Sequence, residues 1–247
     1  ATTEKRINSV FGSASLGFNG MFYLDVTGRN DWSSTLPSSS NSYFYPSVAG
    51  SFILSEILPD NLTSTLSYAK LRVSWAQVGN DTEPYRIADP VYDARPNFGS
   101  NPMITTANVI NNPNLKPENT TSWEIGGEFR LWKDRVTLDA TYYNSETKDQ
   151  IARVDQSSTT GYTSRILNVG TISNKGVELA LSFIPVRTSN FEWGIGVNFA
   201  KNTNRVVDLI DGVSSIRLQN FPFSASIQAR EGEPMGVIVG TDFTYDD

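Results

Sequence analysis

The chain has 247 residues, of which 38% are hydrophobic, and its formal net charge is −6. This composition is that of a folded protein, and the negative charge argues against a nucleic-acid partner, whose phosphates require a basic surface. The sequence contains no Cys and no His, which excludes disulfides, zinc clusters and imidazole catalysis within these residues. No apolar run approaches the ~20 residues of a membrane-spanning helix, and residues 1–10 lack the apolar core of a signal peptide.

Strict alternation of apolar and polar side chains begins near the N-terminus. This is the pattern of strands with one apolar face and one polar face, because successive side chains on a strand point to opposite sides. The first alternating run is followed by Asn19-Gly20, the dipeptide that favours a two-residue type I′ turn. Strands are predicted at 7–18, 21–29, 43–54 and 68–78, with polar connections at 30–42 and 55–67.

The longest interruption is residues 79–119, which contain six prolines and many Asn residues. We expect no regular structure there, and loops of this length usually bind ligands or act as lids. The clearest strand pair follows at 123–143, where two alternating runs join at Lys133-Asp134. Further strands are predicted at 164–184 and 191–200, with a turn at 185–190, polar loops at 155–163 and 209–222, and weaker strands at 224–230 and 235–243.

Short and long connections alternate along the chain, apart from the medium-length piece at 55–67. Every second connection of an up-and-down sheet lies at the same end, so one end carries tight turns and the other carries long polar loops. This sorting is typical of outer-membrane β-barrels, and a soluble sandwich has no reason to show it. The predicted fold class is therefore all-β, with antiparallel up-and-down strands that form part of a large transmembrane β-barrel.

The spacing of two tryptophans fits the same interpretation. At ~3.3 Å per residue and a tilt near 40°, the nine steps from Trp123 to Trp132 cover roughly 23 Å of the membrane normal. Outer-membrane barrels have an apolar band of about 25 Å with an aromatic girdle at each rim. Trp132 is out of phase with Trp123, so we expect it to lie in the turn.

Several motifs then follow one another in the order of a known family. They are Arg29-Asn30-Asp31-Trp32-Ser33-Ser34, Tyr45-Pro46-Ser47-Val48, Asn112-Pro113-Asn114-Leu115-Lys116-Pro117-Glu118, Trp123-Glu124-Ile125-Gly126, Asp139-Ala140-Thr141-Tyr142-Tyr143-Asn144, Asn168-Val169-Gly170-Thr171, Asn174-Lys175-Gly176-Val177-Glu178-Leu179, Asn202-Thr203-Asn204-Arg205 and Gly232-Glu233-Pro234-Met235-Gly236. This ordered series covers most of the chain and resembles the SusC/RagA family of TonB-dependent outer-membrane transporters.

The resemblance implies a plugged barrel of about 22 strands in the bacterial outer membrane. Residues 1–247 would all belong to the barrel, and we expect the plug domain and the barrel-closing strands to be absent from this chain. The implied function is import of an oligosaccharide or peptide nutrient. The implied partners are a SusD-like surface lipoprotein, the TonB complex through the missing plug region, the remainder of the barrel and the lipid bilayer. No cofactor and no enzymatic activity are implied.

Two other functions stay open from the residues alone. A secreted all-β adhesin or carbohydrate-binding module would require the apolar faces to close on each other in a sandwich core. A carboxylate hydrolase would require a pair of acids at a defined separation. The acids of this sequence are spread over several strands, so lining of a polar lumen is the favoured interpretation.

The predicted site residues fall into three groups, with no catalytic or metal-binding residue among them. Aromatic rings stack on sugars or peptide side chains, and Arg pairs with carboxylates; contact with substrate or lid is therefore predicted for Trp32, Tyr85, Arg86, Tyr92 and Arg95, although packing of the loops against each other would also explain them. Predicted to face the lumen are Glu124, Glu128, Arg130, Asp139, Glu178, Glu192 and Asn198. Predicted to face lipid or form the girdles are Trp75, Trp123, Leu138, Leu181, Trp193, Ile195 and Phe199.

Overall fold

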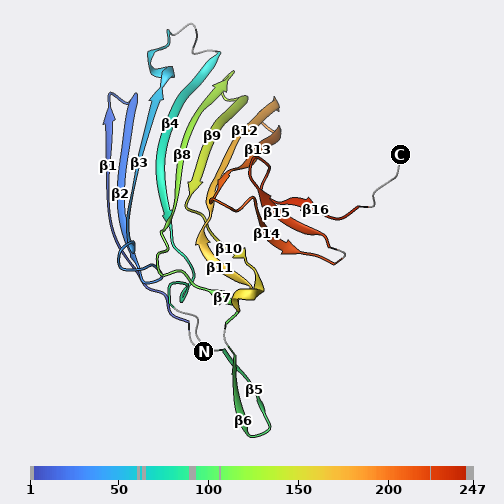
Figure 1. Cartoon of the computed structure of the whole chain (residues 1–247). Coiled ribbons are helices and arrows are strands. Elements are labelled where there is room, and N and C mark those ends of the chain that lie inside the picture. The colour runs from blue at the N-terminus through green and yellow to red at the C-terminus, as the bar shows by residue number, and fades with distance from the viewer. Residues whose placement is uncertain are drawn as a thin grey trace.

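The computed structural model describes residues 3–59, 62, 65–88, 93–105, 107–222 and 224–242. Its main element is an eight-stranded sheet in the order β1-β2-β3-β4-β8-β9-β12-β13 (Figure 1). All neighbouring pairs are antiparallel, which confirms the predicted up-and-down, all-β fold class. The strands are β1 (Ile7–Phe18), β2 (Phe22–Ser33), β3 (Ser42–Ile53), β4 (Leu66–Asn80), β8 (Glu118–Leu131), β9 (Val136–Lys148), β12 (Gly170–Arg187) and β13 (Glu192–Leu209).

Smaller sheets surround one end of this wall of strands. A hairpin joins β5 (Asp93–Phe98) to β6 (Asn101–Thr105). A second sheet has the order β10-β11-β7, with β10 (Ile151–Asp155), β11 (Ser164–Asn168) and β7 (Val109–Ile110). A third contains β14 (Ser215–Asn220), β15 (Ser226–Arg230) and β16 (Val237–Val239), and short 3₁₀ turns occur at η1 (Leu54–Ile57) and η2 (Ser158–Thr160).

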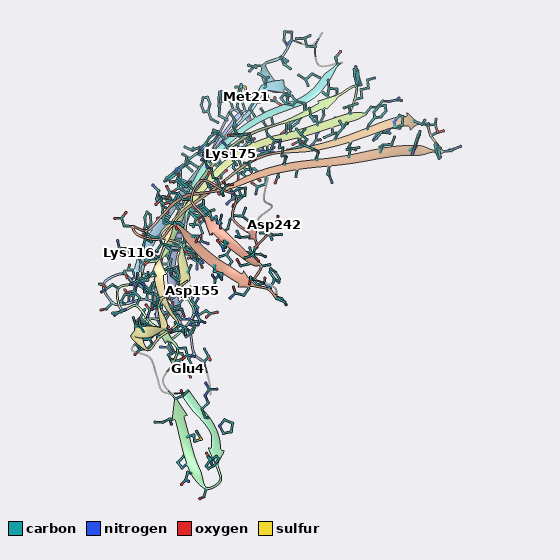
Figure 2. The ribbon with its side chains drawn as sticks, turned by 45° about the vertical axis from the view of Figure 1, so that its right-hand side comes forward. Glu4, Met21, Lys116, Asp155, Lys175 and Asp242 are labelled. Atoms are coloured by element: carbon teal, nitrogen blue, oxygen red, sulfur yellow. The ribbon has the colours of Figure 1, made fainter. Side chains whose placement is uncertain are left out.

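The connections are sorted by end, as predicted. Figure 1 shows the β1–β2, β8–β9 and β12–β13 turns together at one end of the main sheet, which we call the turn end. The smaller sheets lie toward the opposite end, which we call the loop end. In Figure 2, Met21 marks the turn end, while Glu4, Lys116 and Asp155 mark the loop end. The connection through η1 lies at the turn end although it is longer than the tight turns.

The β1–β2 turn has the predicted conformation with one extra residue. Asn19 and Gly20 have positive φ values of 52° and 69°, and the Met21 amide donates to the Phe18 carbonyl at 3.1 Å, as a type I′ turn requires. Phe18 pairs with Phe22 in the ladder, so Met21 stays outside it. The loop therefore has three residues rather than two.

The β8–β9 turn is longer than predicted. Trp132, Lys133 and Asp134 all have positive φ values, of 53°, 58° and 61°. Trp132 therefore lies in the turn and not in the strand, as expected from its phase.

Two predicted loops contain more regular structure than expected. β2 continues to Ser33 and β3 begins at Ser42, which shortens the connection predicted at 30–42. The stretch 79–119 contains β5, β6, β7 and the start of β8, so the prediction of a structureless loop was wrong. The β7 strand pairs in parallel with β11, a long-range pairing that the local sequence pattern does not indicate.

The predicted long strand at 164–184 is interrupted at Val169, which separates β11 from β12, and Gly170 is the first residue of β12. Gly170 has a φ of +146°, a conformation that residues with side chains rarely adopt. A Cβ at this position would lie 2.2 Å from the Asp208 carbonyl oxygen on β13. Only glycine fits this close approach of two backbones, and the ladder between β12 and β13 begins there.

Two further predictions at the C-terminal side need correction. The turn predicted at 185–190 is partly strand, because β12 continues through Pro185 to Arg187. The ladder accommodates the proline with an irregularity between Phe183 and Val186, where a missing N–H donor is tolerated. The loop predicted at 209–222 contains β14.

The buried hydrophobic clusters lie at the loop end. One cluster contains Val154, Val169, Val206, Ile216 and Ala229, and the other contains Leu36, Leu115 and Ile166. Among the described residues, no helix has the length and apolar character needed to span a membrane.

Candidate functional site

One face of the main sheet carries mainly apolar side chains on all eight strands. The registers align Phe18, Phe22, Phe52, Leu71, Gly127, Ala140, Leu179 and Phe199 in one row across the strands. The next row on the same face contains Leu16, Leu24, Gly50, Val73, Ile125, Tyr142, Val177 and Lys201. Phe18 (63%), Val73 (56%) and Phe199 (53%) are exposed, so no other described part of the chain covers them. We call this the apolar face.

The opposite, polar face carries charged, hydroxyl and small side chains. Its most extensive described ion-pair network joins β4 to β9, because Arg72 donates to both Asp139 oxygens at 2.8 and 2.5 Å and to the Thr141 hydroxyl at 2.6 Å. The guanidinium crosses over β8 at Gly126, where an added Cβ would lie 2.9 Å from the Arg72 Nε atom. A glycine on the middle strand therefore makes room for an ion pair that ties three strands together.

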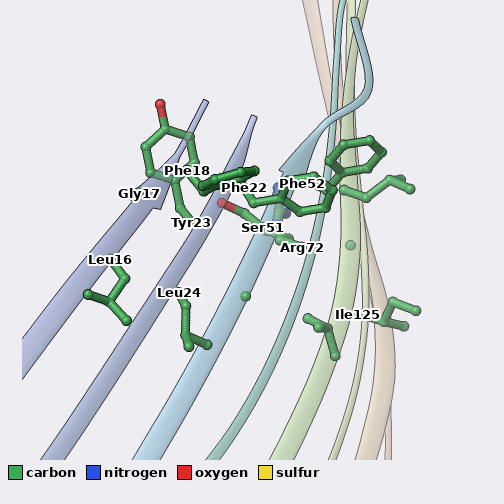
Figure 3. A pocket seen from close by; sticks show the side chains of 14 residues that line it. Leu16, Gly17, Phe18, Phe22, Tyr23, Leu24, Ser51, Phe52, Arg72 and Ile125 are labelled. Carbon is green, nitrogen blue, oxygen red and sulfur yellow. The ribbon is translucent and has the colours of Figure 1, made fainter. Parts of the chain in front are cut away.

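A hollow of about 760 Å³ lies on the apolar face near the turn end (Figure 3). The Phe22 and Phe52 rings stack beside it with centroids 4.5 Å apart. Gly50 has no side chain and leaves a gap in its row between Leu24 and Val73. The walls are mainly hydrocarbon, so this hollow offers a shape complementary to other hydrocarbon rather than groups for catalysis.

A second hollow, of about 440 Å³, lies on the polar face near the loop end. Phe11, Arg29 and Tyr45 form one row across β1, β2 and β3 beside it. The Arg29 Nε donates to Asp31 at 2.7 Å and its Nη2 donates to the Ser9 hydroxyl at 2.9 Å. The Tyr45 hydroxyl donates to the second Asp31 oxygen, and Asp31 is only 5% exposed. The buried carboxylate thus fixes both the guanidinium and the tyrosine.

Another buried carboxylate fastens the loop end of the wall. Asp81, directly after β4, accepts hydrogen bonds from the hydroxyls of Ser33 and Thr35. It also forms an ion pair with Lys5, which precedes β1. Three segments far apart in the sequence are joined there, so the loop end is held by specific polar contacts as well as by its apolar clusters.

The β14–β16 sheet packs against the polar face of β13. Val206 shares that face with Asn198 because the two are an even number of residues apart on one strand. Its side chain is 0% exposed and belongs to the same cluster as Ile216 and Ala229. The small sheet therefore covers the polar side of the wall and not its apolar side.

The turn before β16 also occupies the edge of β13. The Gly232 amide donates to the Val206 carbonyl, and the Val206 amide donates to the Glu233 carbonyl, both at 2.9 Å. The Met235 amide donates to the Asn204 side chain at 2.8 Å. This is the Gly-x-Pro-x-Gly motif of the sequence, and its backbone satisfies donors and acceptors of a strand edge. We call it the edge clasp.

The residues predicted to face a lumen all lie on strands in phase with the polar face. The structure does not bring their acids together as a reactive pair: Glu128 lies opposite Asp139, but Glu128 accepts from Arg130 at 2.8 Å and Asp139 is held by Arg72. Both carboxylates are thus paired with an arginine, which suits a charged wall and not a hydrolase. The set is Glu124, Glu128, Arg130, Asp139, Glu178, Glu192 and Asn198.

The residues predicted to face lipid all lie in phase with the apolar face. Trp75 is opposite Trp123 in the β4–β8 ladder, and the Trp123 ring lies 5.3 Å from that of Tyr142. Leu138 is opposite Leu181. Trp193, Ile195 and Phe199 share one face of β13 with Val197 and are 51%, 41% and 53% exposed.

The predicted contact residues are scattered. Trp32 belongs to β2 rather than to a loop, and it lies opposite Ser42 in phase with Leu24 of the apolar face. This position favours a place at the rim of the apolar face. Arg95 is on β5 opposite Met103, in the β5–β6 hairpin. Tyr92 lies outside the described residues.

Tyr85 and Arg86 lie together in the connection after β4. Tyr85 is 56% exposed and has a positive φ of 65°. Arg86 forms an ion pair with Glu83. The hydrogen bond from Arg86 is the larger cause, and its positive charge the smaller cause, of a Glu83 pKa below its usual value. The Asn112 amide donates to the Arg86 carbonyl at 3.0 Å. An ion pair and a backbone hydrogen bond therefore fix this part of the long connection.

Sequence reasoning missed the polar-face hollow at the loop end. Its signal was present: Arg29 and Asp31 are two residues apart in an alternating run, so they share a face. The exposed aromatic Phe11 is on that face too, whereas the alternation in β1 drew attention only to the apolar positions. Within the described ranges, no group of three or more acidic side chains is arranged to hold a metal ion.

Comparison with known sequences agrees with this geometry. The family model "TonB dependent receptor-like, beta-barrel" matches residues 1–243. The TonB-dependent receptor P26 of Formosa agariphila is 32% identical over 242 residues, which are 96% of this chain and 24% of that protein. The TonB-dependent receptor SusC of Bacteroides thetaiotaomicron is 27% identical over 223 residues, covering 86% of this chain and 22% of that protein. The chain thus spans about a quarter of the length of these relatives.

Solved structures share the fold. The RagAB peptide transporter superposes with a TM-score of 0.82 at 23% identity, over 94% of this chain and 25% of that chain. The siderophore receptor PirA from Pseudomonas aeruginosa superposes with a TM-score of 0.55 at 16% identity, over 91% and 39% of the two chains. These relatives are receptors and transporters rather than enzymes, in agreement with the expectation for this sequence. The wall of eight strands with its apolar and polar faces belongs to the TonB-dependent receptor-like β-barrel family of the bacterial outer membrane.

Proposed function

We propose that this chain forms part of the wall of an outer-membrane transporter for an oligosaccharide or peptide nutrient. The observation that carries the proposal is the pair of mainly apolar rows that cross all eight strands and include the exposed side chains of Phe18, Val73 and Phe199. In water such a surface would cause aggregation. In a bilayer it is the expected outer surface of a barrel, and the residues of the polar face then line the interior.

The polar face supports the second half of this proposal. Several of its charged side chains pair with one another, as Arg72 does with Asp139 and Arg130 does with Glu128. The secreted-adhesin alternative requires the apolar faces to pack together in a sandwich. In the part of the chain that the structure describes, the apolar face of the main sheet is covered by no second sheet.

The proposed partners follow from the family. A SusD-like surface lipoprotein would act as the lid, the TonB complex would act through a plug domain, and the rest of the barrel would pair with the edges of β1 and β13. Two solved neighbours are described as peptide transporter and peptide importer, which supports import as the activity. Tyr85, Arg86 and Arg95 lie toward the loop end, where such a lid or substrate would arrive.

The sidedness is tested most directly with neighbouring single cysteines. This sequence has no Cys, so Val197→Cys and Asn198→Cys can be spin-labelled in a full-length transporter that lacks other cysteines. The two positions are consecutive on β13 and point to opposite faces. We expect oxygen, which dissolves in lipid, to relax the label at 197, and a water-soluble nickel complex to relax the label at 198. Equal accessibility of both labels to the nickel complex would overturn the proposal.

A further inference from the structure

We propose that the polar-face hollow beside Phe11, Arg29 and Tyr45 is a binding subsite for a neutral sugar ring of a transported glycan. The inference rests on the proposed function, because it requires that the polar face line the path of the substrate. It goes beyond it by choosing between glycan and peptide and by naming the residues of the contact.

The shape of the hollow suits one small ligand group. Its volume of about 440 Å³ lies within the ~300–1,000 Å³ of small-molecule sites. The base contains Ser13, Thr27 and Ser47, which the registers align in one row. The hydroxyls of Thr27 and Ser47 are 2.6 Å apart. Each hydroxyl can both donate and accept a hydrogen bond, as the hydroxyls of a sugar do.

The aromatic wall of the hollow is unusual for a polar face. Phe11 is 77% exposed and lies next to Arg29 in the row formed by β1, β2 and β3. A phenyl ring has a negative face, and the C–H groups on one side of a pyranose ring are weakly positive and apolar. Stacking of these two surfaces would remove Phe11 from water without requiring any charge on the ligand.

The guanidinium is already held in place before a ligand arrives. Arg29 uses two of its five N–H donors on Asp31 and Ser9, and 46% of its side chain is exposed. Its charge centre is 5.9 Å from the Tyr45 ring centroid. A donor that is held in advance loses little conformational entropy on binding, and a sugar hydroxyl or ring oxygen is a suitable acceptor.

The charge balance favours a neutral ligand. Asp31 compensates the charge of Arg29 at 2.7 Å and is itself buried, so the cluster has no net charge to attract an acidic chain or the terminus of a peptide. Hydroxyls, one aromatic face and one fixed donor remain. This combination fits a polyol ring, whose hydroxyls also both donate and accept, better than the separate amide donors and acceptors of a peptide backbone.

The test uses the full-length transporter in detergent micelles and native mass spectrometry. The probes are a mixture of neutral oligosaccharides with varied linkages and a mixture of tri- to hexapeptides. We expect capture of an oligosaccharide, and an affinity about tenfold lower for Phe11→Ala, near the upper end of one aromatic contact. Phe11→Trp should restore binding, and Arg29→Lys, which keeps the charge opposite Asp31, should weaken it. Val10→Ala, on the apolar face, is the matched control.

The outcomes separate the two proposals. If the wild type captures neither probe and supports no uptake of either, the proposed function fails and the subsite fails with it. If glycans are captured but Phe11→Ala binds them as tightly as Val10→Ala does, the subsite alone is refuted. Peptide capture that weakens with Phe11→Ala would refute the sugar assignment. Failure of a hydrophilic maleimide to label Phe11→Cys would show that another part of the protein covers the ring, which also refutes the subsite.

Discussion

The wall and the loop end of this molecule are stabilised in different ways. The wall consists of β1 to β4, β8, β9, β12 and β13, and its large apolar side chains, such as Phe18 and Phe199, are exposed. At the loop end, Leu115 and, on the last part of β13, Val206 are fully buried in clusters to which loops and small sheets contribute. The wall is stabilised by the hydrogen bonds between its strands and by the medium that contacts its apolar face. The loop end is stabilised by buried hydrophobic clusters.

The difference shows how apolar side chains of one chain can be stabilised in two environments, bilayer hydrocarbon and the interior of the protein. An apolar side chain on the wall is stabilised only if hydrocarbon replaces water around it. An apolar side chain at the loop end needs no bilayer, because neighbouring residues exclude the water. The same substitution should therefore have different consequences in the two regions, and the following predictions test that difference.

The largest effect is expected from Leu115→Ala at the loop end. Leu115 is 0% exposed, and truncating a fully buried leucine typically costs about 2–5 kcal/mol. Hydrogen exchange of the full-length protein should accelerate around Leu36 and Ile166, which share its cluster. Exchange in β8 and β9 should stay unchanged. Equal acceleration in both regions would contradict independent stabilisation.

A charge on the apolar face should destabilise the wall almost as much. Leu179 lies on that face near the middle of β12, and an arginine facing lipid near the bilayer midplane costs about 2–4 kcal/mol. We expect Leu179→Arg to shift the denaturant midpoint of folding into lipid bilayers by a corresponding amount. Ala180→Arg, one residue along and on the polar face, is the control. A larger loss for Ala180→Arg would reverse the assignment of the faces.

Loss of the cross-strand ion pair should have a smaller effect. Asp139→Asn keeps the shape of the side chain but removes the charge that faces Arg72. Both side chains are more than a third exposed, at 36% and 37%, so solvent screening limits the loss to about 1 kcal/mol. Urea titration of the full-length protein measures it. The double variant Arg72→Met/Asp139→Asn should lose less than the sum of the single variants; strict additivity would mean that the pair contributes nothing.

The smallest effect concerns Glu83 in the connection after β4. Arg86 lowers the pKa of Glu83 below its unfolded value of 4.5. The stabilisation is therefore present above pH 4.5 and is lost as the pH falls through the lowered folded-state value. Local exchange around Arg86 should differ between wild type and Glu83→Gln at pH 7, and the difference should vanish at strongly acidic pH. A difference that grows on acidification would mean the opposite sign of coupling.

The sequence predicted the wall far better than the loop end, for a physical reason. On the wall each residue needs only the correct face, so the alternation from Phe191 to Phe199 was sufficient to place the first half of β13, which continues to Leu209 beyond the strand predicted at 191–200. Elements of the loop end depend on partners far along the chain: β7 exists because it pairs with β11, and β14 because Ile216 fits against Val206. A local pattern contains no information about such partners.

The candidate site divides in the same way. The side on which Glu124 and Trp193 lie followed from parity alone. The cluster around Asp31 required knowing that Ser9, Arg29 and Tyr45 meet across three strands. Trp32 was assigned to a loop because the Ser-rich segment after it concealed the true end of β2.

The edge clasp limits how much of the β13 edge can pair with a neighbouring strand. Because Val206 on β13 is already hydrogen-bonded to residues 232 and 233, no neighbouring strand can form a ladder with that stretch. A strand laid alongside β13 can therefore form a ladder only between the turn end and the clasp. Toward the loop end, residues 232–235 take the place of such a strand, so this chain's own backbone pairs with that part of the β13 edge.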